Sequence, residues 1–329
     1  MKDVPRDFEL VPCPACLATS ISLAHEGKDW ALNDPAITFR IVQCDDCGFH
    51  YLNPRPKLKI LGRYYTDSYA PYSMGGDDKP ATGARALVLR EAYGPSALRP
   101  RPAARVLARA LITLRGARHF GFGIPWHGQG RLLDFGCGAG KFLKRMHAVG
   151  WDVTGIDFSD VAVSSVRQSG LKALQGSLPH PELSSASFDV VTMRHALEHV
   201  PDPMPVLRAA KDLLAPGGKL IIQVPNFASW EFAYFGDAAE LLDLPRHLNH
   251  FTPQTLADVL RRAGFTHVDV QVVSHASRLR KSAKLLKPGV RGPARRMGAL
   301  FRRSWIARVA AWGCRATNRG NELIATAST

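Results

Sequence analysis

Two pairs of closely spaced cysteines near the start of the chain could bind a metal ion. Cys13 and Cys16 form one Cys-x-x-Cys pair, and Cys44 and Cys47 form a second pair after 27 intervening residues. Two such pairs can present four thiolates at the corners of a tetrahedron, which is a common ligand set of structural zinc. Because every ligand is a thiolate, no coordination position is left open for catalysis. The spacing therefore predicts a structural Zn2+ site.

A second chemical pattern, His-x-x-Glu-His, is formed by His195, Glu198 and His199. On a long helix this spacing would be a zinc-protease signature, because two His on adjacent turns can bind one metal ion. Pro201 and Pro203 follow at once, and proline ends a helix or restricts it to its first turn. The flanking residues therefore argue against a metalloprotease and predict a loop that belongs to another kind of site.

A glycine-rich turn forms the third pattern. Asp134, Gly136, Gly138 and Gly140 follow the scheme Asp-x-Gly-x-Gly-x-Gly. Such glycines let a ligand approach the backbone, where the amide groups at the start of a helix point toward it. A dinucleotide-binding fingerprint would have glycine at the position of Lys141. The turn therefore predicts a nucleotide-like cofactor of a different class.

The elements that would position these residues are indicated by apolar stretches that alternate with helical spans. Asp157 ends the second such stretch, where its carboxylate could accept hydrogen bonds from both hydroxyls of a ribose. Strands that alternate with helices predict a parallel sheet covered on both faces, with ligands at the carboxyl ends of the strands. The predicted strands lie in residues 131–134, 151–157, 171–177, 188–195, 218–226, 267–273 and 322–327.

These motifs, in this order, resemble those of class I S-adenosylmethionine (SAM)-dependent methyltransferases. The stretches that carry the resemblance are LLDFGCGAGKFL, GIDFS, FDVVTMRHALEHVPDP, LLAPGGKLIIQVPN and PRHLNHFTPQTLADVLRRAGF. They cover roughly residues 130–273 and the last strand, and the group looks like the ubiquinone-type and glycan-cluster small-molecule methyltransferases. The four-Cys module also looks like that of some sugar methyltransferases. The resemblance implies an α/β fold with a Rossmann-like, seven-stranded, mostly parallel sheet.

The resemblance also implies roles for particular residues in binding SAM. Asp134 and the backbone of the glycine turn would hold the methionine end, and Asp157 would bind the ribose. The family commonly has an acid after the third strand that accepts from the adenine amino group, and here Ser177 stands there, followed by Leu178. The candidate cofactor-binding residues are Asp134, Gly136, Cys137, Gly138, Gly140, Asp157, Phe158, Ser177, Leu178 and Arg194.

Methyl transfer to a hydroxyl or to an acidic carbon also requires the loss of a proton, and His is the usual base near neutral pH. The resemblance implies that His247, four residues before Phe251, is this base, with His199 and His250 as further catalytic candidates. His199 could instead cap its loop, and His250 could pack beside Phe251. Arg246 could bind a substrate phosphate or carboxylate, or pair with a neighbouring acid. A His–His–Glu metal site across both clusters is a further alternative.

The basic charge is concentrated in two segments. Of the net charge of +15, residues 274–321 contribute +13 and residues 84–119 contribute +7, so the remainder is mildly acidic. We predict a zinc-ribbon-like module in residues 1–55, a linker and helical lid in 56–128, and a methyltransferase domain in 129–329. Residues 274–321 form a basic helical insertion of that domain.

Within the insertion, apolar residues recur at roughly helical spacing, with arginines off the stripe. The stripe consists of Met297, Leu300, Phe301, Trp305, Val309 and Trp312. A basic amphipathic helix of this kind is typical of contact with a membrane surface, which would suit a lipid-linked glycan or isoprenoid acceptor. The alternative is a solvated basic face whose apolar stripe packs on the domain.

Two other functions fit parts of the pattern. An RNA methyltransferase could grip nucleic acid with its basic helices, but Asp45 and Asp46 lie inside the second Cys pair and no platform of aromatic and basic residues is evident. A protein that binds SAM without catalysis is the third interpretation. A small-molecule acceptor, either a sugar or glycan or a lipid-linked intermediate, is the partner that we expect.

The bulk composition agrees with an ordinary soluble globular protein. Hydrophobic residues make up 46% of the chain and charged residues 22%, and no apolar run approaches the ~18 residues that span a bilayer. The opening residues contain acids and prolines where a secretory signal would be apolar. We expect a cytoplasmic protein, with a peripheral position at the inner membrane face as an extension. The acceptor, the methylated atom and the oligomeric state are left open.

Overall fold

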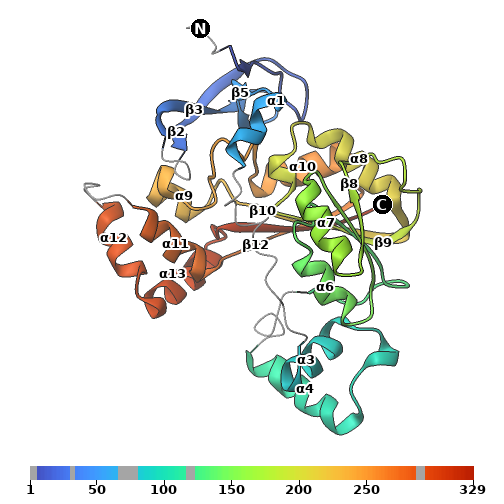
Figure 1. The fold of residues 1–329 in the computed structure, drawn as a ribbon. Helices are drawn as coiled ribbons and strands as arrows, with labels where there is room; N and C mark the ends of the chain where they lie inside the picture. Colours follow the sequence, from blue (N-terminus) through green and yellow to red (C-terminus); the bar gives the residue numbers. More distant parts are fainter. Residues whose placement is uncertain (1–5, 30–33, 66–80, 116–122, 287–292) are drawn as a thin grey trace. The chain divides into compact units, whose positions relative to one another are not determined.

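A computed structural model describes residues 6–29, 34–65, 81–115, 123–286 and 293–329 (Figure 1). The chain divides into two compact units, each with its own hydrophobic core. The first unit comprises Met1–Thr66, His195–Leu207 and Ile222–Ala327, and the second comprises Asp67–Arg194, Arg208–Ile221 and Ser328–Thr329.

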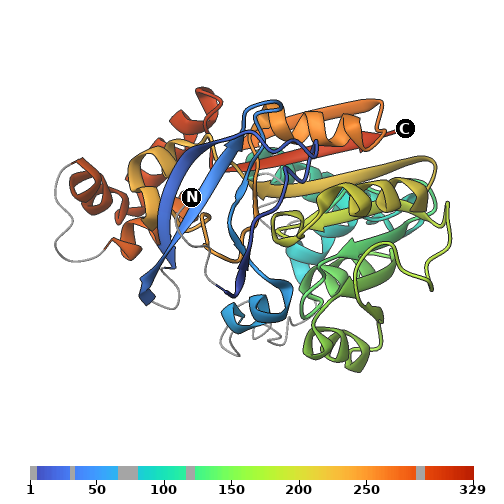
Figure 2. The same cartoon turned by 90° about the horizontal axis from the view of Figure 1, so that it is seen from above.

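An antiparallel sheet begins the first unit. Its longest pair consists of β2 (Ile21–Asp29) and β3 (Asp34–Cys44), drawn in blue in Figure 2. β4 (His50–Leu52) pairs with β3, and β11 (Asn249–His250) pairs with β4, which gives the strand order β11-β4-β3-β2. The N-terminal module therefore shares a sheet with a segment from far along the chain, a pairing that the local sequence pattern does not show. A separate small pair joins β1 (Phe8–Glu9) to β5 (Arg55–Pro56).

Among the described residues, seven strands form a second sheet in the order β12-β13-β10-β9-β6-β7-β8. β6 pairs in parallel with β7 and β9, and β7 pairs in parallel with β8. All seven predicted strands and the predicted α/β fold class are confirmed. The strands are β6 (Arg131–Phe135), β7 (Asp152–Asp157), β8 (Lys172–Gln175), β9 (Phe188–Arg194), β10 (Leu214–Pro225), β12 (His267–Val273) and β13 (Glu322–Ser328).

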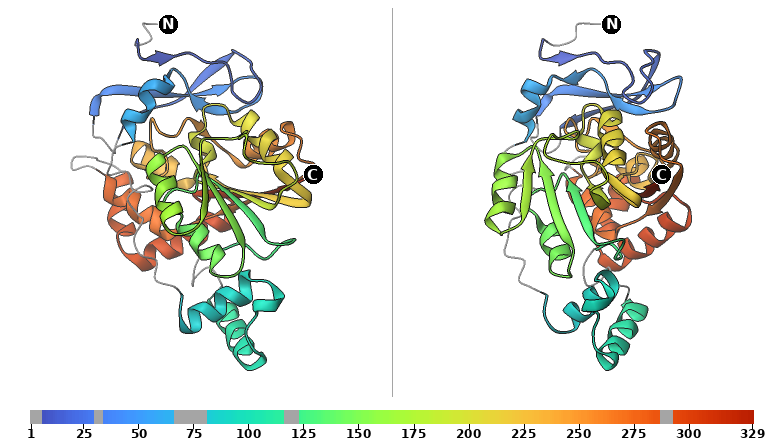
Figure 3. Two further views of the ribbon diagram at one scale, coloured as in Figure 1. Left: turned by 45° about the vertical axis from the view of Figure 1, so that its right-hand side comes forward. Right: turned by 90° about the vertical axis from the view of Figure 1, so that its right-hand side faces the viewer.

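Helices of the second unit pack against these parallel strands. α6 (Lys141–His147) and α7 (Asp160–Gln168) contact β7, and Figure 3 shows them beside the green strands. α7 begins where the Ser159 side chain accepts a hydrogen bond from the Ala162 backbone N–H, which satisfies an otherwise unpaired donor. The strand order reverses at β6, with β7 and β8 on one side and β9 on the other. Such a reversal is where ligands bind in open parallel sheets.

Two further helices lie in the second unit. α3 (Gly83–Tyr93) contacts α4 (Pro102–Arg115), and Glu91 of α3 accepts hydrogen bonds from Arg105 and Arg109 of α4. The sequence pattern predicts α4 but not α3. Parts of the predicted linker, residues 66–80 and 116–122, lie outside the described residues.

The insertion of residues 274–321 lies in the first unit and is helical, as predicted. It contains α11 (Ala276–Leu285), α12 (Pro293–Phe301) and α13 (Ser304–Ala316), which pack together in the orange to red part of Figure 1. The single apolar stripe predicted across Phe301 and Trp312 is wrong. Helix α12 ends at Phe301 and a separate helix, α13, begins at Ser304, so the two parts of the stripe do not lie on one helical face. Phe301 is buried, whereas Trp305 and Trp312 are 63% and 74% exposed. The Met297 side chain lies outside the described residues.

Short helices complete the described structure. They are α1 (Leu58–Leu61), η1 (Gly62–Tyr64), η2 (Ser96–Leu98), η3 (Leu197–His199), α8 (Pro203–Leu213), α9 (Trp230–Phe235), η4 (Gly236–Ala238) and α10 (Pro253–Arg262). Within the described ranges, none of the helices has the length and apolar character needed to cross a membrane.

Candidate active site

The glycine turn connects β6 to α6 at the carboxyl end of β6. Gly136, Gly138 and Gly140 have φ angles of +73°, +51° and +79°, in the left-handed region that glycine adopts without a steric penalty. A Cβ atom at Gly140 would also lie 2.7 Å from Cγ2 of Val166 on α7. The turn therefore needs glycine both for its conformation and for the close approach of α7.

Asp157 links the end of β7 to this turn. Its carboxylate accepts hydrogen bonds from the backbone N–H groups of Gly138 and Ser159, both at 2.9 Å, and the side chain is 6% exposed. A carboxylate offers about four lone-pair positions, so both oxygens can accept further hydrogen bonds. These contacts fix the carboxylate at the carboxyl edge of the sheet.

Asp134 lies below the turn and is almost fully buried. The Thr192 hydroxyl donates to its Oδ1 at 2.6 Å. Burial raises the pKa of Asp134 to about 7, and the positive charge of Arg194 acts in the opposite direction. The Arg194 guanidinium itself stacks 4.5 Å from the centroid of the Phe142 ring. Asp134 therefore changes its charge near neutral pH, which makes its attraction for a cationic ligand group dependent on pH.

The remaining candidate cofactor residues lie in the same unit. Phe158, directly after Asp157, is 57% exposed, so its ring offers an apolar surface beside a buried carboxylate. On the loop after β8, Ser177 is exposed and Leu178 is buried. Cys137 is buried within the turn, and burial raises the pKa of its thiol. The predicted cofactor residues thus lie at the carboxyl ends of β6–β9 or on the loops that follow these strands.

In the His-x-x-Glu-His motif, Glu198 and His199 lie in a short 3-10 turn, η3, and His195 lies in a bend before it, so the motif is not on a long zinc-protease helix. Glu198 is fully buried, and the Nδ1 atom of His195 lies 3.2 Å from its Oε1 atom. The Nε2 atom of His195 lies 3.7 Å from Oε1 of Glu322. Burial alone would lower the pKa of His195, but the two carboxylates raise it to about 9. His195 is therefore a cation held between two carboxyl groups.

His199 and His247 form a pair of imidazoles in the same unit. Their ring centroids lie 4.6 Å apart, with the rings almost perpendicular. Nδ1 of His247 lies 2.9 Å from the Leu241 carbonyl, and Nδ1 of His199 lies 3.0 Å from the Arg246 carbonyl. Because a carbonyl can only accept, Nδ1 of His247 carries the proton and the lone pair of the neutral His247 ring lies on Nε2. Nδ1 of His199 also lies 3.0 Å from the Tyr65 hydroxyl. Burial and the neighbouring histidines keep the pKa of His247 well below its usual value, so His247 is neutral.

Glu198 lies close to both His195 and His247. Its Oε1 atom lies 3.9 Å from Nε2 of His247, and one ligand atom from each of Glu198, His199 and His247 lies within 4.8 Å of the others. A carboxylate beside a neutral imidazole suits proton transfer, because it stabilises the imidazolium that forms. The same three side chains also offer a ligand set that divalent cations accept. The geometry thus supports the predicted histidine site and leaves the His–His–Glu metal alternative open.

A buried ion network surrounds the cluster, and sequence reasoning did not find it. Glu322, at the start of β13, accepts hydrogen bonds from Gln223 and from Arg278 on α11. Arg278 also donates to Glu240 at 2.8 Å. Burial raises the pKa of Glu322, but the charges of His195 and Arg278 outweigh it and hold the pKa well below the usual range. No local spacing links these residues, because they come from segments that are distant in the sequence.

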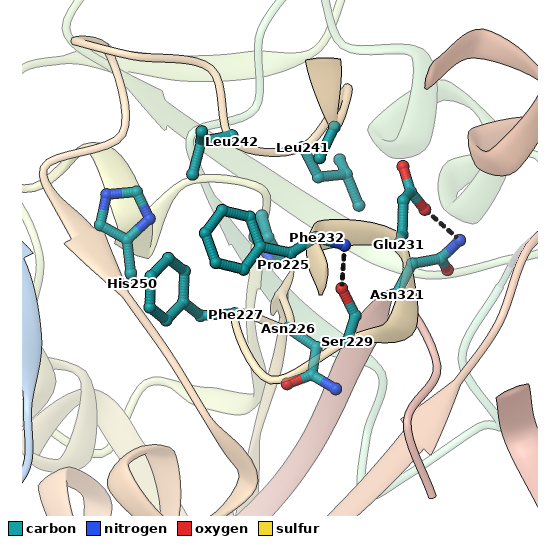
Figure 4. Close-up of a pocket in the computed structure, with 11 residues that line it drawn as sticks. Pro225, Asn226, Phe227, Ser229, Glu231, Phe232, Leu241, Leu242, His250 and Asn321 are labelled. Atoms are coloured by element: carbon teal, nitrogen blue, oxygen red, sulfur yellow. Dashed lines mark hydrogen bonds between the residues drawn. The ribbon is translucent and has the colours of Figure 1, made fainter. Parts of the chain in front are cut away.

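His250 lines a small pocket together with Phe227, Phe232 and other residues that follow β10 (Figure 4). Its ring centroid lies 5.3 Å from that of Phe227. Burial lowers the pKa of His250 to about 3, so the ring is neutral. Its buried Nε2 atom has no hydrogen-bond partner among the described residues. A donor on a bound molecule would satisfy this atom, so His250 fits a contact with an acceptor substrate better than a charged role.

Arg246 is held by acids of its own chain. It is 1% exposed, and its guanidinium binds both carboxylate oxygens of Asp29 at 3.0 and 3.2 Å. A second ion pair joins it to Asp243 at 2.7 Å. A buried guanidinium needs such partners, because an unpaired buried charge is strongly destabilising. The structure thus favours the neighbouring-acid alternative for Arg246.

The four cysteines of the N-terminal pairs converge in the first unit. The sulfur atoms of Cys13 and Cys47 lie 3.6 Å apart, and those of Cys16 and Cys44 lie 3.5 Å apart. Disulfide sulfurs would be about 2.05 Å apart, whereas thiolates about 2.3 Å from a tetrahedral zinc ion lie ~3.8 Å from one another. Gly48, with φ of +70°, closes the second knuckle. The geometry fits one zinc ion bound by four thiolates.

The chain is similar to known methyltransferases. A family model described as "Methyltransferase domain" matches residues 97–270. The ubiquinone biosynthesis O-methyltransferase of Bordetella avium (strain 197N) is 38% identical over 147 residues, which cover 41% of this chain and 61% of that protein. The enzyme of the same name from Aromatoleum aromaticum is 34% identical over 158 residues, which cover 44% of this chain and 68% of that protein. A solved SAM-dependent methyltransferase from Archaeoglobus fulgidus is 20% identical, with a TM-score of 0.45, over 67% of this chain and 94% of that chain.

The family match spans more than half of the chain and includes the glycine turn, Asp157 and the histidines of both clusters. The chain spans less than two thirds of the length of the first of these curated relatives. The Cys pairs and residues 274–321 lie outside the matched range. The strand order, the glycine turn and the family match together show that the chain belongs to the class I SAM-dependent methyltransferases, through its methyltransferase domain.

Proposed function

We propose that this protein transfers a methyl group from SAM to a hydroxyl or an activated carbon of a small molecule. One observation carries the catalytic part of the proposal: the neutral, buried His247 has its Nδ1–H bound to the Leu241 carbonyl, which leaves Nε2 as a base. SAM supplies a methyl carbon that is bonded to a positively charged sulfur and therefore open to attack by a nucleophile.

The second unit would hold SAM with residues that fit its parts. The backbone of Gly138 and Gly140 leaves room for the methionine end, and the carboxylate of Asp157 can accept from both ribose hydroxyls. Ionised Asp134 attracts the ammonium group of the methionine end, and the exposed ring of Phe158 can pack against adenine. Their shared task is to fix the methyl group in one orientation, since positioning is the main requirement of an in-line displacement.

The first unit would prepare the acceptor. Nε2 of His247 takes the proton of the acceptor hydroxyl or carbon acid, and the hydrogen bond to Leu241 keeps the ring in its orientation. The buried carboxylate of Glu198, 3.9 Å from Nε2, stabilises the imidazolium that results. His199 packs edge-on against the ring, and His250 can contact the acceptor in its own pocket.

A sugar, a glycan or a lipid-linked isoprenoid intermediate is the acceptor class that we favour. The relatives named ubiquinone biosynthesis O-methyltransferases support a small-molecule acceptor. The exposed side chains of Trp305, Val309 and Trp312 on α13 lie among arginines, a composition that suits the interface of an anionic membrane. Cosedimentation with acidic liposomes at low salt tests this peripheral contact, and an unbound protein would exclude it.

A divalent cation shared by Glu198, His199 and His247 is the competing interpretation of the cluster. The two interpretations differ in metal content. If His247 is a base, the purified protein holds about one zinc ion per chain, bound by the four cysteines, and His247→Ala does not change this number. A second equivalent of metal that disappears in His247→Ala would show that His247 is a ligand instead.

The overall proposal is tested by turnover. Labelled SAM is incubated with the zinc-loaded protein and three acceptor panels: sugar and glycan derivatives, isoprenoid phenols, and transfer RNA. We expect transfer of the label to a small molecule and none to RNA. Methylation of RNA alone would favour nucleic-acid methylation, and tight SAM binding without turnover on any panel would favour a non-catalytic SAM-binding protein.

A further inference from the structure

The helices of the insertion border a cavity that the proposed methyl transfer does not use. Its volume is about 290 Å3, at the lower end of the range of roughly 300–1,000 Å3 that is usual for small-molecule sites. The cavity lies wholly within the first unit, between α9, α11, α12 and α13. Its apolar lining includes Trp230, Tyr234, Phe235, Leu279, Phe301 and Ala310.

The polar atoms of this lining are few, and the buried ones already have partners. Glu231 borders the cavity, but its carboxylate accepts from Ser282 at 2.5 Å and from Asn321 at 2.8 Å, and Figure 4 shows the second of these contacts. Because the carboxylate is satisfied within the protein, the cavity does not require a polar ligand. Apolar walls of this kind gain free energy when an aliphatic chain leaves water to contact them.

An arginine side chain borders the cavity. The guanidinium of Arg319 lies 4.8 Å from the centroid of the Trp230 ring, which lines the cavity, and Arg315 is exposed next to the lining residue Cys314. Residues 274–321 contain thirteen Lys and Arg and no Asp or Glu. An aliphatic molecule with an anionic head would therefore be favoured over a neutral one, since guanidinium groups bind phosphate and carboxylate oxygens well.

Gly313 keeps part of this space open. It lies within α13 and borders the cavity, and a Cβ atom built on it would have no neighbour within 4 Å. Glycine weakens a helix interior relative to alanine, leucine or other residues with side chains. A residue that is unfavourable for the helix thus stands where a larger side chain would enter the cavity.

We propose that this cavity binds the aliphatic chain of an anionic amphiphile, whose head group is bound by Arg319. The lining residues of α11, α12 and α13 lie outside the range matched by the methyltransferase family model, and occupation of the cavity needs neither SAM nor methyl transfer. The proposal therefore goes beyond the proposed function, and each can fail without the other.

Calorimetric titration of the full-length, zinc-loaded protein with hexyl, octyl and decyl phosphate, each as a monomer, tests the proposal. We expect the affinity to rise about fourfold per added methylene until the cavity is filled. Inorganic phosphate and decanol separate the two parts of the ligand, and both should bind at least tenfold more weakly than decyl phosphate. Arg319→Gln should lower the affinity for decyl phosphate and leave that for decanol unchanged.

Gly313→Leu is the decisive variant, because its side chain would occupy the cavity while leucine favours the helix. We expect at least a tenfold loss of decyl phosphate affinity. Ala316→Leu, on an exposed position of α13 that does not border the cavity, is the matched control and should bind as the wild type does. Titration with S-adenosylhomocysteine shows in parallel that the variants are folded. Affinity that does not depend on chain length, or that is equal in Gly313→Leu and wild type, would overturn the proposal.

Discussion

The glycine turn and the histidine cluster solve the problem of placing functional groups in different ways. The turn draws on residues 134–158, which are continuous in sequence, and it relies on left-handed backbone angles and on one carboxylate bound by two amide groups. The cluster combines residues 195–199 with residues 241–247 and with Glu322, and it relies on buried ionisable side chains that set one another's charge.

This difference predicts which properties each region controls. Damage to the turn should change cofactor affinity, because the turn offers binding groups and no base. Damage to the cluster should change turnover with little effect on cofactor affinity, because His247 and Glu198 act on the acceptor in our proposal. The pH responses should differ as well, since the pKa of Asp134 lies near 7 and that of His247 lies far below its usual value.

The largest effect is expected for His247→Asn. The amide nitrogen of asparagine can still donate to the Leu241 carbonyl, so the loop is retained while the base is lost. Steady-state assays at saturating SAM should show a decrease in kcat of about 10²–10⁴-fold, the usual contribution of general-base catalysis. His267→Ala, an exposed position on β12, is the control and should keep wild-type turnover. If His247→Asn retained wild-type kcat, His247 would not be the base.

Disruption of the four-Cys site, where we predict a zinc ion, should have the next largest effect and should distinguish the two regions. The Cys-bearing strand β3 pairs with β4, and β4 pairs with β11, which contains His250 and follows His247 closely in sequence. A strong chelator, or Cys44→Ser, should therefore abolish most of the turnover and leave the affinity for S-adenosylhomocysteine within about twofold. Metal analysis and calorimetry check both values. A parallel loss of cofactor affinity would show that the two regions are coupled.

Asp157→Ala should weaken binding of S-adenosylhomocysteine at least tenfold, which corresponds to about 1.4 kcal/mol. The carboxylate also ties the turn to β7, so Asp157→Asn serves as the companion variant because it retains acceptor oxygen with less charge. Calorimetric titration measures both variants. Wild-type affinity in Asp157→Ala would remove the assigned ribose contact while leaving the family membership intact.

The smallest effect is a pH dependence of cofactor binding. With a pKa of about 7, Asp134 is mostly ionised at pH 8 and mostly protonated at pH 6. Ionised Asp134 attracts the ammonium group of S-adenosylhomocysteine, so affinity should fall by roughly tenfold between pH 8 and pH 6. Asp134→Asn should bind weakly at both values.

Much of the fold could be predicted from local patterns. All seven strands of the large sheet were predicted. A strand buried on both faces, such as β9, is a continuous apolar run, and a half-exposed strand, such as β12, alternates apolar and polar residues, so neither needs its partner to be recognised. Helix α3 was missed, since its residues have only a weak apolar stripe. The stripe across α12 and α13 was assigned to one helix because spacing alone does not show that α12 ends at Phe301 and that a new helix begins at Ser304.

The sequence by itself determined the Cys pairs, the glycine turn and the acid at the end of β7, because these features depend on residues that are neighbours in the chain and on conformations that only glycine adopts easily. Only the tertiary structure decided that His195 is a cation, that His247 is neutral with its lone pair on Nε2, and that Arg246 is paired with Asp29. Protonation state and tautomer follow from burial and from hydrogen-bond partners. Those partners, such as Glu322 and Leu241, come from other segments of the chain, so no local spacing could reveal them.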